Sequence, residues 1–241
     1  MNISSLKEII KRSSVGPFVK KMYRLFPIAR PKYSFAQLGE DLILDHFVQY
    51  KKDGFYVDIG AYHPMDISNT HIFYKRGWSG IQVEPNSSRC NLFKRYRPQS
   101  LTLNIGIGPE QSTGTFYLFE EESLSTFSAE SAELNITLGN TFLEKREVSL
   151  LPLHMVFETY AKDKIIDIMS IDTEGYDMEV LKTNDWERFR PRFIVIETVE
   201  FDVGIYGKKL NDIYDVYMKS IQYEKIADTY LNTIYTDIHG K

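Results

Sequence analysis

The fold of this chain is decided by the run Phe55-Tyr56-Val57-Asp58-Ile59-Gly60-Ala61-Tyr62-His63-Pro64. Its first five residues are mainly apolar and lead to a glycine, which is typical of a short buried strand. Residues 69–76 then suit a helix, and residues 80–83 form a second apolar run that ends at Glu84-Pro85. A strand, a helix and a strand in this order predict a βαβ unit.

The alternation of helical and strand-like patterns continues on both sides of this unit. Upstream, Ser34-Phe35-Ala36-Gln37 has the form of a capping box before a helix that starts at Leu38, and we give Gln37 no role beyond that box. Downstream, we expect helices over 88–96, 156–162 and 210–221, strands over 101–105, 165–171 and 193–196, and a closing antiparallel pair over 223–227 and 231–235. This pattern predicts an α/β fold: a mostly parallel sheet with helices on both faces and a C-terminal antiparallel hairpin.

Length and composition indicate a single catalytic domain with an N-terminal appendage. The chain has 241 residues, of which 43% are hydrophobic, and this is enough for one sizeable core. We expect the domain over residues 33–241, with an insertion or lid over 109–145, where the pattern is irregular and rich in Ser, Thr, Glu and Asn. The net charge of -4 lacks the basic excess that nucleic-acid binding needs, so no nucleic-acid partner is expected. The single cysteine, Cys90, fits a reducing compartment.

Residues 1–32 differ from the rest of the chain in charge. They hold eight Lys and Arg against one Glu, a net charge of +7, interleaved with apolar residues. Such a basic amphipathic segment suits peripheral contact with an anionic membrane or an acidic protein partner. The alternative is a solvated basic helix packed on the domain or on a second subunit. Since neither a membrane span nor a signal peptide is evident, we expect a cytoplasmic protein, peripheral at the inner face of the membrane if this segment binds lipid.

Polar side chains close five successive predicted strands. In open α/β sheets, ligands bind beyond the carboxyl ends of the strands, near the point where the strand order reverses. A buried carboxylate needs a partner to offset its desolvation, so several of them at one edge indicate a binding site. The five residues are Asp58, Glu84, Asn104, Asp172 and Glu197.

The ends of the first two strands suit an adenosyl cofactor. Gly60 lets a ligand approach the first strand-to-helix turn, and the following helix offers free amide donors. Glu84 lies 26 residues after Asp58, near the spacing at which an acid accepts both ribose hydroxyls. The turn lacks the second and third glycines of the dinucleotide fingerprint, which disfavours NAD. The alternative for Asp58 and Glu84 is helix capping or a salt bridge.

Several ordered blocks of the chain resemble the FkbM family of methyltransferases. The blocks are residues 34–41, 55–64, 68–70, 73–74, 77–81, 83–86 and 170–177, within a match from about Tyr33 to Tyr235. This resemblance implies a Rossmann-like class I methyltransferase fold, with S-adenosylmethionine bound by the first two strand-end motifs. It also implies O-methylation of sugars and natural products. The expected cofactor contacts are Asp58, Gly60, Ala61, Ser68, Asn69, Glu84 and Asn104.

The acceptor is expected at the end of the fourth strand, which should lie next to the first. An alcohol is a poor nucleophile and needs a base, or a metal that lowers its pKa. Asp172 and Glu174 are the leading candidates for the base or for ligands of a divalent ion, and His63 could serve instead because histidine titrates near neutral pH. The alternatives are a helix N-terminal acid for Glu174 and a hydrogen-bonded structural histidine for His63. Ser68 and Asn69 either cap the next helix or contact the methionine carboxylate or the acceptor.

The sequence therefore predicts S-adenosylmethionine-dependent methylation of a hydroxyl on a sugar, a glycan or a related small molecule. One alternative function is that of a nicotinamide-dependent oxidoreductase, but such an enzyme needs the second and third glycines of the dinucleotide fingerprint, which this turn lacks. Another is a methyltransferase-like scaffold that binds without turnover. Asp172, Glu174 and Glu197 argue against the scaffold, because a scaffold has no need to bury several acids together.

Overall fold

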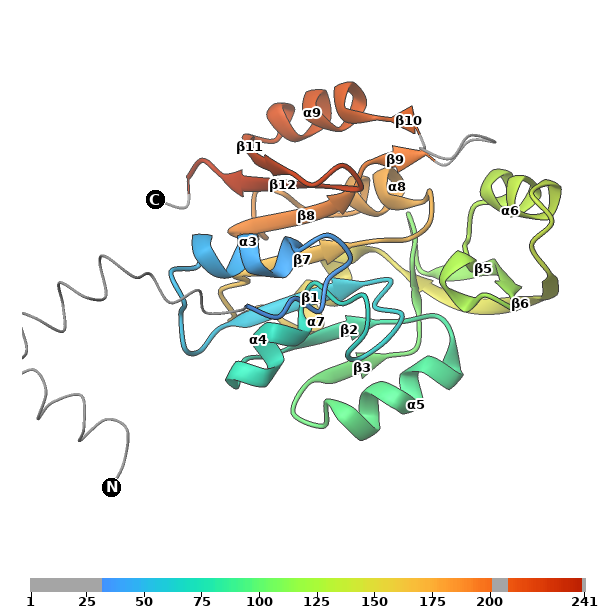
Figure 1. The fold of residues 1–241 in the computed structure, drawn as a ribbon, viewed down its shortest axis with the longest axis horizontal. Coiled ribbons are helices and arrows are strands. Elements are labelled where there is room, and N and C mark those ends of the chain that lie inside the picture. The colour runs from blue at the N-terminus through green and yellow to red at the C-terminus, as the bar shows by residue number, and fades with distance from the viewer. Residues whose placement is uncertain (1–31, 201–207, 240–241) are drawn as a thin grey trace, which may run out of the picture. The chain divides into compact units, whose positions relative to one another are not determined.

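The computed structural model describes residues 32–200 and 208–239. The strands of its main sheet are β1 (Phe55–Ile59), β2 (Ser79–Val83), β3 (Leu101–Leu103), β7 (Ile168–Ile171), β8 (Phe193–Glu197), β11 (Tyr223–Asp228) and β12 (Asn232–Asp237). Among the described residues they lie in the order β11, β12, β8, β7, β1, β2, β3 (Figure 1). β12 is antiparallel to both of its neighbours, and the other pairs are parallel. The predicted α/β fold with a C-terminal antiparallel hairpin is confirmed.

Helices cover both faces of this sheet. α3 (Glu40–Phe47) and α4 (His71–Arg76) pack on one face, and α7 (Leu153–Tyr160), α8 (Asp177–Lys182) and α9 (Asn211–Ser220) pack on the other. α5 (Ser87–Tyr96) packs beside β3. Successive strand residues point to opposite faces, so Tyr56 joins the apolar cluster under α3 and α4, whereas Val57 joins the cluster under the other three helices. This two-sided burial explains why β1 and β7 are almost continuously apolar.

The region predicted as an insertion or lid forms most of an ordered second sheet, which extends a few residues beyond it at each end. β4 (Gly106–Ile107), β6 (Phe142–Leu151) and β5 (Ser112–Phe119) form it in that order, and the short 3-10 helix η1 (Glu122–Leu124) and α6 (Ala129–Thr137) connect β5 to β6. It has its own small core of Phe116, Leu118 and Val148. Figure 1 places this unit beyond the carboxyl ends of the main strands. A small pair, β9 (Val199–Glu200) and β10 (Lys208–Lys209), completes the strands of the described ranges.

The loop before α3 differs from the prediction, because no capping box forms at Ser34. The helix begins at Glu40, after Gly39, which has a left-handed φ of 91°. Asp41 instead accepts hydrogen bonds from the Ser34 hydroxyl at 2.6 Å and from the Phe35 amide at 2.8 Å. A carboxylate inside the helix therefore fixes this loop, rather than a serine in front of it.

The third strand also ends earlier than predicted, at Leu103 instead of Ile105. The chain leaves the main sheet at Asn104, and Gly106 and Ile107 pair with Leu150 and Leu151 of β6. Asn104 and Ile105, the last two residues of the predicted strand, therefore connect the two sheets and belong to neither.

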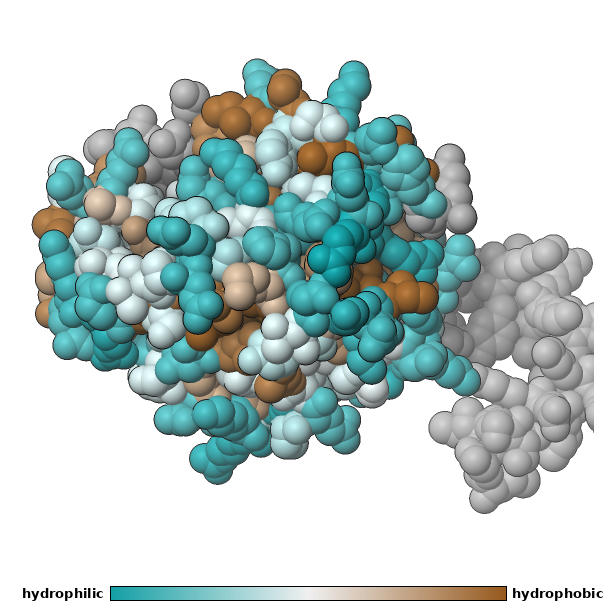
Figure 2. Space-filling model, turned by 180° about the vertical axis from the view of Figure 1, so that it is seen from behind, coloured by the Kyte–Doolittle hydropathy of each residue, from teal (hydrophilic) through white to brown (hydrophobic). Residues whose placement is uncertain are grey.

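The surface seen from behind is mainly hydrophilic, with apolar side chains in small groups between polar ones (Figure 2). In residues 32–200 and 208–239, no helix is long and apolar enough to cross a membrane. The basic amphipathic segment predicted over residues 1–32 lies outside the described residues except for Lys32, where they begin.

Candidate active site

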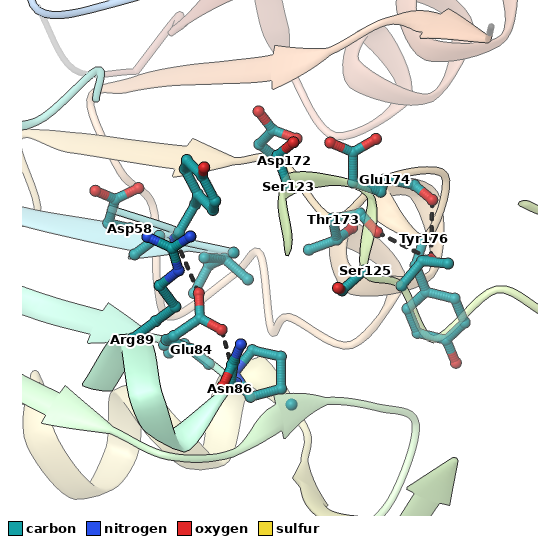
Figure 3. Close-up of a pocket in the computed structure, with 18 of the residues that line it drawn as sticks. Asp58, Glu84, Asn86, Arg89, Ser123, Ser125, Asp172, Thr173, Glu174 and Tyr176 are labelled. Carbon is teal, nitrogen blue, oxygen red and sulfur yellow. Dashed lines mark hydrogen bonds between the residues drawn. The ribbon is translucent and has the colours of Figure 1, made fainter. Parts of the chain in front are cut away.

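A pocket of about 210 Å³ lies at the carboxyl ends of β1, β2, β7 and β8. The strand order reverses between β2 and β7, on either side of β1, so the pocket sits where open α/β sheets bind ligands. Figure 3 shows Glu84, Asn86 and Arg89 on one side, and Asp172 and Glu174 on the other. The sequence-predicted residues that line it are Asp58, Gly60, Ala61, Ser68, Asn69, Glu84, Asp172 and Glu174, together with Glu197.

Gly60 brings three strand ends together. Its φ is +72°, and a Cβ at this position would lie 1.7 Å from the carbonyl oxygen of Asp172. The amides of Gly60 and Ala61 donate to the Val83 carbonyl at 3.0 and 3.3 Å. The glycine is therefore required by the neighbouring strand end. The amides of Gly60 and Ala61 are thus used within the protein, and the expected free donors at the start of the following helix stay a prediction.

The carboxylate of Glu84 is held at the end of β2 by two backbone amides. The Tyr62 amide donates to one carboxylate oxygen at 2.8 Å, and the Asn86 amide donates to the other at 2.7 Å. Burial raises the pKa of Glu84 to about 7, although both amides act against the rise. Each oxygen keeps a further lone pair for a ligand hydroxyl. The helix cap is Asn86, whose side chain accepts from the Ser88 amide, so Glu84 is not a cap.

Asp58 faces a buried arginine that the sequence pattern did not single out. Arg97 is fully buried, and its Nη1 lies 3.9 Å from a carboxylate oxygen of Asp58. Its guanidinium also donates to the Pro64 carbonyl, the Ser68 hydroxyl and the Thr70 hydroxyl, each at 2.8 Å. Burial raises the pKa of Asp58, and Arg97 opposes that rise. The salt-bridge alternative for Asp58 therefore describes its contacts, and no local signal marks Arg97, because its partners lie about 30 to 40 residues away in sequence.

Asn69 bridges the first loop to β7. Its side-chain amide donates to the Ser170 hydroxyl at 3.1 Å, and both residues line the pocket. Asn104 lies outside the pocket lining. Its side chain donates to the carbonyls of Glu84 and Pro85 at 3.0 and 2.8 Å. Asn104 therefore supports the turn that carries Glu84 instead of facing a ligand.

His63 also lies outside the pocket lining. Its Nδ1 accepts hydrogen bonds from the amides of Met65 and Asp66 at 3.3 and 3.0 Å. Burial lowers the pKa of His63, which favours the neutral ring that these two bonds need. These contacts match the alternative of a structural histidine that closes a turn.

Four carboxylates gather at the ends of β7 and β8, namely Asp172, Glu174, Asp177 and Glu197. Burial raises the pKa of Asp172 to about 7 and that of Asp177 to about 6, and repulsion from Asp177, Asp58 and Glu40 adds to the rise for Asp172. Burial and the same repulsion raise the pKa values of Glu174 and Glu197 well above the ordinary range. Asp177, which was not among the residues predicted from the sequence, accepts from the Thr173 amide at 2.9 Å. Its position in the first turn of α8 was the available signal.

Residues 122–127, which we call the strap, form one wall of the pocket. At one end, a carboxylate oxygen of Glu122 accepts from the Asn86 side chain at 3.1 Å and pairs with Arg89. At the other end, the Thr126 hydroxyl donates to the Glu174 carbonyl at 2.9 Å. The strap thus crosses from the Glu84 side to the Glu174 side, and it lies within the segment that was predicted as an insertion or lid.

A metal site was an open alternative for the acids. Within the two described ranges, no group of three or more His, Cys, Asp or Glu side chains is arranged to hold a metal ion.

The sheet order and the pocket define a Rossmann-like α/β protein with its ligand site at the carboxyl ends of the central strands. The sequence model of the methyltransferase FkbM domain matches residues 58–224. The chain therefore belongs to the FkbM family of methyltransferase domains, and the resemblance seen in its motifs is confirmed.

Solved structures with a similar fold include three methyltransferases. A TehB-like SAM-dependent methyltransferase from Corynebacterium glutamicum is 10% identical with a TM-score of 0.42, and the match covers 92% of this chain and 97% of that one. An O-methyltransferase from Bacillus cereus in complex with SAH is 12% identical with a TM-score of 0.41, and the match covers 96% of each chain. A Burkholderia thailandensis 1,6-didemethyltoxoflavin-N1-methyltransferase is 9% identical with a TM-score of 0.41, over 82% of this chain and 74% of that one. No curated protein matches the chain in sequence.

Proposed function

We propose that this protein transfers a methyl group from S-adenosylmethionine to a hydroxyl of a sugar, a glycan or a related small molecule. Membership of the FkbM family supports methyl transfer. The observation that carries the proposal is a single pocket with Glu84 on one side and Asp172 and Glu174 on the other (Figure 3). Such a pocket separates a place for a cofactor from a place for an acceptor.

The residues at the ends of β1 and β2 fit the adenosyl part of the cofactor. S-adenosylmethionine carries its methyl group on a sulfonium and presents two vicinal ribose hydroxyls. Glu84 is aimed into the pocket by two backbone amides and retains lone pairs for both hydroxyls. The Asn69 side chain and the Ser68 loop lie on the β7 side of the Gly60 turn, where they would border the methionine part of the cofactor.

The residues at the ends of β7 and β8 suit the acceptor. In-line methyl transfer depends mainly on positioning, and an alcohol also needs a group that takes its proton as the new bond forms. Asp172, with its pKa raised to about 7, is a stronger base when ionised than an ordinary carboxylate. Asp172 or Glu174 would therefore accept the hydroxyl proton, and the strap would exclude water from the same space.

Titration calorimetry of the full-length protein with S-adenosylmethionine, S-adenosylhomocysteine and NAD tests the cofactor. We expect the first two to bind and NAD not to bind. Binding of NAD alone would favour the oxidoreductase, and binding of neither methyl-transfer ligand would overturn the proposal.

The acceptor is tested by mass spectrometry of glycans and nucleotide-sugar pools from cells with and without the protein. We expect a species heavier by one methylene, about 14 daltons, only when the protein is present. If the cofactor binds but no methylated product forms from any pool or added acceptor, the scaffold alternative holds.

A further inference from the structure

Gln37 lines the pocket, although it lies before the residues that the family model matches. The family match begins at residue 58, and Gln37 comes from the loop before α3. Its side chain is exposed and lies among the lining residues, which places it at the mouth of the pocket. The capping box would have made Gln37 a structural residue, but that box does not form.

The loop that carries Gln37 is fixed by two fully buried carboxylates, Glu40 and Asp41. Asp41 accepts from the Ser34 hydroxyl and the Phe35 amide, and Glu40 accepts from the Leu38 amide at 2.9 Å. Burying carboxylates is costly unless donors surround them. Here the donors include the loop's own amides on both sides of Gln37, so its backbone is held in place.

Two further contacts show on which side of the pocket this loop lies. The Ser68 amide donates to the Phe35 carbonyl at 2.7 Å, and the Asn232 side chain donates to Glu40 at 3.0 Å. Asn232 is the β12 residue that pairs with Glu197 at the end of β8. The loop therefore runs from the first pocket loop to the end of β8, which is the side of the acids, whereas Glu84 stands at the end of β2 beyond β1.

We propose that Gln37 binds hydroxyl groups of the acceptor and helps to select it, and that it does not contribute to cofactor affinity. This inference rests on the proposed function. A carboxamide both donates and accepts, so it can bind two neighbouring hydroxyls of a sugar ring. Because the loop backbone is already ordered, the conformational entropy lost on binding is mainly that of the Gln37 side chain.

The test compares the full-length protein with Gln37→Ala and with the control Leu38→Ala, whose side chain is 50% exposed in the same loop and does not line the pocket. The probes are S-adenosylhomocysteine, measured by calorimetry, and a panel of methyl pyranosides that differ in single hydroxyl configurations. The pyranosides are measured by saturation-transfer NMR with the protein saturated in S-adenosylhomocysteine. We expect Gln37→Ala to weaken the best pyranoside about 3- to 10-fold, the scale of one neutral hydrogen bond. Both variants should keep S-adenosylhomocysteine affinity within twofold.

Each other outcome contradicts a different statement. If Gln37→Ala and the wild type bind the pyranoside equally, or if Leu38→Ala weakens it as much, Gln37 is not an acceptor contact. If Gln37→Ala weakens S-adenosylhomocysteine tenfold, Gln37 belongs to the cofactor part of the pocket. If the wild type binds S-adenosylhomocysteine but no pyranoside, the carbohydrate class of acceptor fails, and the role of Gln37 in selecting it fails with it. If it binds neither probe, the proposed function itself fails.

Discussion

Replacing Glu84 by glutamine removes a charge from the pocket while keeping the size of the side chain. The folded protein raises the pKa of this carboxyl from 4.5 to about 7 by burying it. When folding raises the pKa of a carboxyl group, the protonated group stabilises the folded state at pH values below the pKa of the unfolded state. This stabilisation is lost as the pH rises through the pKa of the folded state. One pKa unit corresponds to about 1.4 kcal/mol. Relative to its value at low pH, the free energy of unfolding of the wild type therefore falls by about 3 kcal/mol at pH 8 but by only about 1 kcal/mol at pH 5.

Glutamine does not ionise, so it avoids this pH-dependent loss of stability, but it leaves a hydrogen bond unmade. It has only one side-chain oxygen, so either the Tyr62 or the Asn86 amide loses its acceptor. An unsatisfied buried donor costs about 1 to 3 kcal/mol at any pH in this range. Relative to the wild type, Glu84→Gln should therefore gain about 2 kcal/mol in free energy of unfolding between pH 5 and pH 8.

Thermal unfolding of the unliganded proteins at pH 5 and pH 8 measures this difference. For a domain of this size, 2 kcal/mol corresponds to a change of about 4 to 8 °C in the Tm difference between variant and wild type. The exposed Glu224→Gln on β11 is the control and should show no such change. A Tm difference that is the same at both pH values would refute the reasoning from burial.

The same variant tests the role of Glu84 in binding. Loss of a charged hydrogen-bond acceptor for ribose should weaken S-adenosylmethionine by about 1.5 to 3 kcal/mol, or at least tenfold. Unchanged affinity in calorimetry, with the fold intact, would show that Glu84 does not hold the ribose.

Four other perturbations have defined outcomes. Asp172→Asn should lower turnover about 10²-fold or more while cofactor affinity barely changes. If EDTA abolishes the activity of the wild type and magnesium restores it, the acids have a metal-binding role instead of direct proton abstraction. Gly60→Ala should unfold the protein or lower its Tm strongly, since its Cβ would overlap the Asp172 carbonyl; a wild-type Tm would contradict the strand packing. Arg97→Met should cost about 3 kcal/mol or more in denaturant unfolding, because it leaves the buried Asp58 without its cation. Removal of residues 1–32 should reduce co-sedimentation with anionic vesicles at low salt but not cofactor affinity, and equal sedimentation would exclude the membrane role.

The sequence by itself determined the sheet and the place of the pocket. Apolar runs of the length of β1 and β8 are buried on both sides, and the residue that ends such a run lies at the carboxyl edge of the sheet. The positions of Asp58, Glu84 and Asp172 in the pocket follow from this periodicity, whereas the adjacency of β7 to β1 was expected from the fold class and is confirmed by their pairing. These features depend on contacts that repeat along the chain, and a linear pattern records them.

Only the tertiary structure decided which polar residues face a ligand and which serve the protein. His63 and Asn104 stand at promising positions, but the hydrogen bonds of His63 close its own turn, and those of Asn104 support the turn that carries Glu84. Gln37 reaches the pocket from a loop that was expected only to cap a helix, and the strap does so from the segment that was expected to be an insertion or lid, without a specific contact being predicted. Arg97 acquires its role from partners about 30 to 40 residues away in sequence. A side chain's hydrogen-bonding partners depend on the three-dimensional closure of the fold, which the periodicity of apolar residues does not encode.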